Sequence, residues 1–168
     1  INGITGLHEI QVNGSSTLYY NAASAEIQKL IVSAGSEFHV AGSGYGTLTI
    51  NDTLSADSTG KLVFGLSTAG ADQIIYSGTT ALTGTLSLDI ALGAVTAGTD
   101  FTILTSTESL SGLTLNPVYT YTAAGMRPTT ATASIVDDTK IVVNITSGGA
   151  ADLTWIPGTT GTWGTDLP

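Results

Sequence analysis

The side chains in this sequence that could do acid–base or metal chemistry are mostly carboxylates. The chain has thirteen acidic residues, two histidines and no cysteine. Without cysteine there is no disulfide framework, thiolate catalysis or Cys-ligated zinc, and the redox compartment stays open. Ser-His-Asp catalysis needs a histidine held by an orienting carboxylate, but neither His8 nor His39 lies near a nucleophile elbow. Any site must therefore be built from carboxylates and aromatic rings.

Asp57 is the candidate catalytic residue, in the stretch Asp57-Ser58-Thr59-Gly60. This stretch is close to the Asp-Thr/Ser-Gly loop of aspartic proteases, but it carries one extra residue and has no second copy to pair with. Polysaccharide-cleaving β-helix enzymes usually line a groove with Asp, Arg and Lys, whereas Arg127 is the single arginine of this chain. An Asp before a Gly is common in turns. We expect a turn, and keep an extracellular hydrolase acting on glycoprotein or polysaccharide as an alternative.

No metal site and no cofactor are expected. Calcium loops such as Gly-Gly-x-Gly-x-Asp or Asp-x-Asp/Asn-x-Asp-Gly are missing. Asp137 and Asp138 are adjacent, and neighbouring residues of a hairpin point to opposite sides. A 20-residue shift sets His8 over Gln28 and His39 over Tyr19, so the two histidines lie on different segments and do not share an ion.

Exposed aromatic rings are the best candidates for a binding surface, because they stack on sugars and anchor protein contacts. The candidate ligand-binding residues are Tyr19, His39 and Tyr45. The same register places Tyr19 beside His39 on the outer face of one coil segment. A carbohydrate-binding module is therefore a second alternative function.

The net charge of -9 comes from four basic and thirteen acidic residues. Such a surface repels phosphate backbones and anionic headgroups, so nucleic acid is not an expected partner. No run of about 20 apolar residues could span a bilayer, and we expect no membrane insertion by this segment. The sequence opens at Ile1, so we expect any signal peptide to lie outside it.

Three strands are predicted in a row within Lys61 to Leu92, each bounded by Gly, Ser, Thr or Asp. They cover Lys61–Phe64, Asp72–Tyr76 and Thr85–Ile90. Asp72 and Asp89, at strand edges, are expected in turns or on the outer face. The residues expected in the core are Leu62, Phe64, Ile74, Leu86 and Leu88.

An apolar-x-apolar motif recurs at intervals of 20 and then 18 residues, the length of one solenoid coil. Stacked coils would bury Ile10, Leu30 and Leu48 in one column. A second column would consist of Leu18, Phe38 and Leu54.

The last strands are expected to form an antiparallel hairpin. Residues 132–136 and 141–145 flank Asp137-Asp138-Thr139-Lys140, which is a good turn sequence. The hairpin could cover the open end of the stack, where unpaired backbone groups would recruit other chains. The predicted fold is all-β, a right-handed single-stranded β-helix with an antiparallel C-terminal hairpin cap. A two-sheet β-sandwich is the alternative.

Several segments resemble bacterial surface proteins with autotransporter-associated β-strand repeats. The resemblance covers Thr47 to Trp163 and is carried by Lys61-Leu62-Val63-Phe64, Ala71 to Gly78, Leu82 to Leu88, Thr96 to Thr105 and Leu153-Thr154-Trp155 with Gly161-Thr162-Trp163. In that family the Trp pair usually opens another repeat unit. The resemblance therefore implies a β-helix domain over 1–146 and a tail over 147–168 that leads into a further repeat of a longer protein.

By this resemblance, the expected function is a non-catalytic stalk or adhesin-like passenger segment of a bacterial protein. Its expected location is secreted or on the cell surface, at the outer membrane. Host or matrix glycans or surface proteins are the expected partners, and the oligomeric state stays open.

Overall fold

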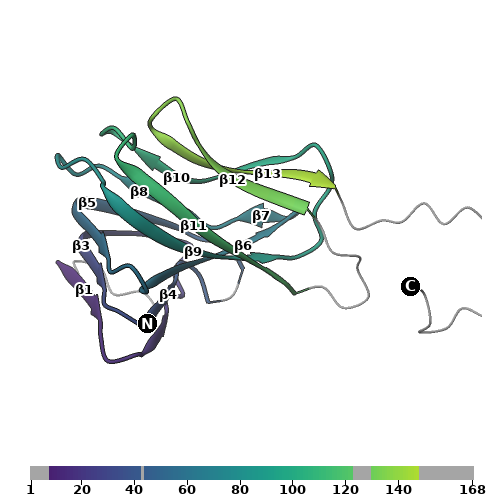
Figure 1. Cartoon of the computed structure of the whole chain (residues 1–168). Coiled ribbons are helices and arrows are strands. Elements are labelled where there is room, and N and C mark those ends of the chain that lie inside the picture. Colours follow the sequence, from purple (N-terminus) through teal and green to yellow (C-terminus); the bar gives the residue numbers. More distant parts are fainter. Residues whose placement is uncertain (1–7, 43, 123–129, 148–168) are drawn as a thin grey trace, which may run out of the picture.

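The computed structural model describes residues 8–42, 44–122 and 130–147 and contains thirteen strands and no helix within them (Figure 1). The predicted tail with Trp155 and Trp163, and Arg127, lie outside the described residues. The strands are β1 (Glu9–Val12), β2 (Thr17–Tyr19), β3 (Ser24–Val32), β4 (Glu37–His39), β5 (Thr47–Ala56), β6 (Lys61–Ser67), β7 (Gly70–Ala71), β8 (Gln73–Tyr76), β9 (Gly84–Leu92), β10 (Asp100–Ser106), β11 (Leu113–Tyr121), β12 (Thr130–Val136) and β13 (Lys140–Ser147).

Successive coils place one strand in each of two sheets. The seven-stranded sheet has the order β1-β3-β5-β8-β10-β13-β12, and the six-stranded sheet has the order β11-β9-β6-β4-β2. All ladders between coils are parallel. The fold is a β-solenoid of about four turns, as predicted. The parallel register excludes the antiparallel sandwich.

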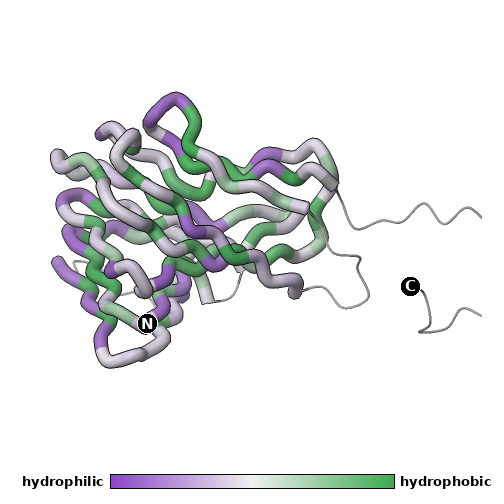
Figure 2. Tube along the Cα trace, viewed as in Figure 1, coloured by the Kyte–Doolittle hydropathy of each residue, from purple (hydrophilic) through white to green (hydrophobic). Residues whose placement is uncertain are grey.

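The core lies between the two sheets and is filled from both by alternate residues. Along β5, for example, Leu48 and Ile50 are buried and Thr49 between them is not. Hydrophobic residues follow the strands of both sheets, and several turns are hydrophilic (Figure 2). The five residues predicted in the core are all buried, which confirms them: Leu62, Phe64, Ile74, Leu86 and Leu88.

The predicted core columns were wrong beyond the second coil. Ile10 does pair with Leu30, but Leu30 then pairs with Leu54, while Leu48 pairs with Ala25 and Ile74. The reason is that β5 is ten residues long and carries both Leu48 and Leu54 in one sheet. A register shift between Ile27 and Lys29 contributes to the same change.

The coils lengthen along the chain, so no single repeat length applies. The central column of the six-stranded sheet runs through Leu18, Phe38, Leu62, Leu88 and Pro117. The corresponding spacings, taken as differences of those residue numbers, are 20, 24, 26 and 29. Leu62 thus occupies the place predicted for Leu54.

The predicted hairpin is confirmed and lies at the C-terminal end of the stack. Strand β13 pairs antiparallel with both β10 and β12, so the hairpin extends the seven-stranded sheet. The Tyr119 hydroxyl of β11 accepts a hydrogen bond of 2.7 Å from the backbone N–H of Ala133 in β12. This bond links the last strands of the two sheets and helps to close that end.

Candidate functional site

The outer face of the six-stranded sheet carries a hollow, which we call the outer hollow. Its rows follow from the register: His39, Val63 and Asp89 are neighbours, and Gly65 lies beside Ala91 in the next row. The Asp72 carboxylate and the edge of the Tyr45 ring lie over Gly65, where a Cβ would stand 3.2 Å and 3.8 Å from them, and Ala91 adds only a methyl group. The hollow has a volume of about 350 Å³, and its lining includes His39, Tyr45, Val63, Gly65, Asp72 and Ala91.

Tyr19 and His39 stack at the side of the outer hollow, as the 20-residue register predicted. Their ring centroids are 4.2 Å apart and the ring planes are inclined by 30°. Strands β2 and β4 pair with Tyr19 opposite His39. Two of the three predicted ligand-binding residues are therefore in direct contact, and the third, Tyr45, lines the same hollow as His39.

Tyr45 is held in place by the hairpin between β6 and β7. Its hydroxyl donates a hydrogen bond to the Ser67 hydroxyl. A Cβ atom on Gly70 would stand 2.7 Å from a ring carbon of Tyr45, so the ring packs directly on the glycine backbone. Any larger residue at Gly70 would displace the ring. The Tyr45 ring is thus positioned before any ligand arrives.

Asp72, predicted in a turn or on the outer face, lies in the connection between β7 and β8 and lines the outer hollow, but it is only 2% exposed. Its Oδ1 accepts a hydrogen bond of 3.0 Å from the Gly46 N–H, and its Oδ2 accepts one of 2.7 Å from the Gly65 N–H. Burial raises the pKa of the Asp72 carboxyl, and the two backbone hydrogen bonds oppose that rise. The carboxylate ties the segment after Tyr45 to β6. The sequence around Asp72 does not indicate these hydrogen bonds, because their donors are 26 and 7 residues away.

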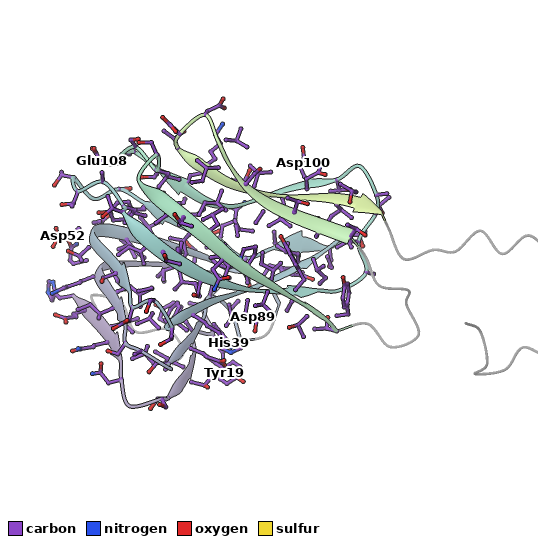
Figure 3. All side chains as sticks on the ribbon, viewed as in Figure 1. Tyr19, His39, Asp52, Asp89, Asp100 and Glu108 are labelled. Atoms are coloured by element: carbon purple, nitrogen blue, oxygen red, sulfur yellow. The ribbon has the colours of Figure 1, made fainter. Side chains whose placement is uncertain are left out.

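His39 has hydrogen-bonding capacity that the described residues leave unused. Its Nε2 is buried without a hydrogen-bond partner, and the Glu37 carboxylate lies 3.9 Å from it. Burial lowers the pKa of His39, while the charges of Glu37 and Asp89 pull it upward. Figure 3 shows Tyr19, His39 and Asp89 together, away from Asp52, Asp100 and Glu108. Asp89 itself lies on the outer face, as expected, and accepts a hydrogen bond of 3.0 Å from the Thr120 hydroxyl.

No protein-family model, curated protein or solved structure matches this chain. What the site can do is therefore argued from its own residues.

The candidate catalytic residue Asp57 lies in an exposed turn. Its Oδ1 accepts a hydrogen bond of 2.7 Å from the Ser58 N–H, and its carbonyl oxygen accepts one of 2.8 Å from the Gly60 N–H. These are the bonds of a capped turn. Asp57 does not line the outer hollow. The structure thus separates the one proposed catalytic carboxylate from the predicted aromatic residues.

The described residues contain no group of three or more His, Asp or Glu side chains that could hold a metal ion. His8 lies beside the seven-stranded sheet, where its carbonyl accepts a hydrogen bond of 3.0 Å from the Lys29 N–H. His39 belongs to the six-stranded sheet, so the histidines lie on different segments, as predicted. Asp137 and Asp138 form the turn of the terminal hairpin. No helix in the described part of the chain is long and apolar enough to cross a membrane.

Proposed function

We propose that this chain is a rigid, non-catalytic segment of a bacterial secreted or surface protein, serving as a stalk or adhesin-like passenger at the outer membrane. The observation that carries the proposal is the pair of parallel ladders, β1-β3-β5-β8-β10 and β2-β4-β6-β9-β11. Every coil in these ladders is hydrogen-bonded to its neighbours on both sheets. A stack of this kind resists bending because no flexible linker separates the coils.

The surface chemistry supports the same proposal. Only 10% of the residues are charged, and the chain has a net charge of -9. The outer face of β5, for example, carries Thr47, Thr49 and Asn51, and such uncharged polar residues suit contacts to host or matrix glycans or surface proteins. The resemblance to autotransporter-associated β-strand repeats points in the same direction.

Adhesion of the isolated chain tests the adhesive half of the proposal. Beads coated with the 168-residue chain are passed over immobilised extracellular-matrix glycoproteins and over the same proteins after enzymatic deglycosylation. Beads coated with heat-unfolded chain are the control. We expect the folded chain to retain beads more strongly than the unfolded control. Equal retention by both would contradict the adhesive role.

A hydrolase acting through acidic residues is the competing function. Incubation of the chain with glycoprotein and polysaccharide substrates between pH 3 and pH 7 checks it, with Asp57→Asn as the comparison. The proposal expects no cleavage by either protein. Cleavage that disappears in the folded Asp57→Asn variant would replace the proposed function with a hydrolytic one.

A further inference from the structure

The shape of the outer hollow suits a small, ring-shaped ligand. Its volume of about 350 Å³ lies at the small end of the roughly 300–1,000 Å³ that ligand sites occupy. Gly65 and Ala91 lie side by side in its lining. The Asp72 carboxylate and the Tyr45 ring lie over Gly65, where a Cβ would stand 3.2 Å from Asp72 Oδ2 and 3.8 Å from Tyr45 Cε1, so the small residue left for a ligand ring to approach is Ala91.

The aromatic groups of the hollow come from separate parts of the fold. His39 belongs to β4 and is backed by the stacked ring of Tyr19. Tyr45 precedes β5 and is fixed by Ser67 and Gly70 of the neighbouring hairpin. The Asp72 carboxylate holds the next residue after Tyr45 through its backbone N–H. Rings held in this way lose little conformational entropy on binding, which favours affinity.

The charges around the hollow select against anions. Among the described residues that line it there is no lysine or arginine. The nearest row of the sheet has Lys61, whose ammonium is paired with the Glu37 carboxylate at 3.1 Å. Both oxygens of Asp72 are already bonded to backbone N–H groups. A phosphate, sulfate or sialic acid group would therefore find no lysine or arginine in the described lining to pair with.

His39 lines the outer hollow with its ring, while its Nε2 lies 3.9 Å from the Glu37 carboxylate, which is not part of the lining. The buried Nε2 of His39 has no hydrogen-bond partner in the described structure. A nitrogen without accessible surface offers no hydrogen bond to a ligand, so what His39 contributes to the hollow is its ring. Two aromatic rings and a lining without lysine or arginine among the described residues together favour a neutral ligand that has an apolar ring face.

We propose that the outer hollow binds a neutral saccharide of one or two pyranose rings, packed against Tyr45 and His39. The inference rests on the adhesive part of the proposed function and names its ligand class. It assigns Tyr45 and His39 as ring contacts and gives Tyr19 the role of supporting His39.

Two pairs of matched variants test the site on the full chain. Ala91→Leu places a larger side chain in the hollow, and Ala34→Leu makes the same change in an exposed turn outside it. Tyr45→Ala removes a ring of the hollow, and Tyr121→Ala removes a 47% exposed tyrosine of β11 outside it. The wild-type chain is screened on an array of neutral, sialylated and sulfated glycans. The strongest neutral glycan is then titrated against each variant by calorimetry, and thermal unfolding checks that each variant is folded.

We expect a neutral glycan to bind, and expect Ala91→Leu and Tyr45→Ala to weaken it about tenfold or more, corresponding to roughly 1.4 kcal/mol. Ala34→Leu and Tyr121→Ala should stay within about twofold of wild type by the same reasoning. If Tyr45→Ala unfolds, the comparison of Ala91→Leu with Ala34→Leu decides. An array without neutral hits, a preference for sialylated or sulfated glycans, or equal affinities of Ala91→Leu and Ala34→Leu would overturn the inference. The surface location of the chain is measured in a separate experiment. The proposed stalk function can therefore hold even if no saccharide binds in the outer hollow.

Discussion

At the scale of single residues, the site depends on contacts that span many positions of the sequence. Asp72 is bonded to the backbone of Gly46 and Gly65, and Tyr45 lies on Gly70. The alternation of strand residues predicted the contact between Tyr19 and His39, because both lie one coil apart at the same phase. It did not predict the position of Tyr45 or the burial of Asp72, because both lie in segments between strands.

Replacing Asp72 by Asn should destabilise the fold. An amide has one acceptor oxygen and an NH₂ group, so one of the two backbone N–H donors would face another donor. We expect a loss of about 1–3 kcal/mol in the free energy of unfolding, as for a buried donor left unpaired. Urea denaturation followed by circular dichroism measures it.

Asp57→Asn is the control for this substitution, because Asp57 is exposed. The side-chain oxygen of asparagine can still accept the hydrogen bond from the Ser58 N–H. Its effect should stay within about 0.5 kcal/mol. Identical urea midpoints for Asp72→Asn and Asp57→Asn would show that the buried carboxylate does not hold the hollow together.

The His39 imidazole should make stability depend on pH below its ordinary pKa of 6.5. Burial lowers the pKa of His39 in the folded protein, so the unfolded chain takes up the proton first as the pH falls. The free energy of unfolding should therefore decrease from pH 6.5 downward until the lower folded pKa is passed. In His39→Gln this contribution should be missing, giving a flatter profile.

Two measurements check the histidine prediction. NMR titration of the His39 ring should give a midpoint below 6.5, and urea unfolding at a series of pH values should give a steeper slope for wild type than for His39→Gln. A midpoint above that value would mean that the Glu37 and Asp89 charges outweigh burial.

At the scale of the elements, the sequence predicted the strands better than their pairing. Lys61–Phe64, Asp72–Tyr76 and Thr85–Ile90 all fall on or next to observed strands, because alternation and turn residues are local signals. The predicted core columns were wrong because the pairing register depends on coil length. The coils lengthen from 20 to 29 residues along the central column. A motif search with a fixed period cannot follow that change.

Leu62 should be more sensitive to truncation than Leu18, although both belong to the same column. Leu62 is fully buried between Phe38 and Leu88, whereas Leu18 is half-buried in the first described coil. We expect Leu62→Ala to cost about 2–5 kcal/mol and Leu18→Ala clearly less. Thermal and urea unfolding of both variants measure the difference. Equal losses would indicate that the column is not the continuous core strip described above.

The terminal hairpin should become more stable when Asp138 is replaced by Gly. Asp137 and Asp138 have φ angles of 52° and 56°, in the left-handed region that a type I′ turn requires. Glycine adopts this region without a Cβ penalty, so Asp138→Gly should raise the free energy of unfolding by about 0.5–1 kcal/mol. Asp57→Gly, in a turn where the side chain bonds the Ser58 N–H, should not stabilise. A lower melting temperature for Asp138→Gly would contradict this reading of the turn.

At the scale of the whole molecule, the chain combines a stacked fold with few charged residues. Residues far apart in sequence meet because each coil repeats the path of the one before, as Tyr19, His39, Val63 and Asp89 do in one row. The recurring apolar-x-apolar motif predicted an all-β solenoid, and the fold is confirmed. The location on a bacterial surface and the partners there stay predictions, because they depend on the whole protein.

The central claim is that this chain works outside the cell as a non-catalytic surface segment. The most direct measurement is antibody labelling of cells that carry the gene, with antibodies raised against the folded chain, on intact and on permeabilised cells. A strain that lacks the gene is the control. The account predicts labelling of intact cells, or of their culture medium, that the control strain lacks. Labelling that appears only after permeabilisation would contradict it.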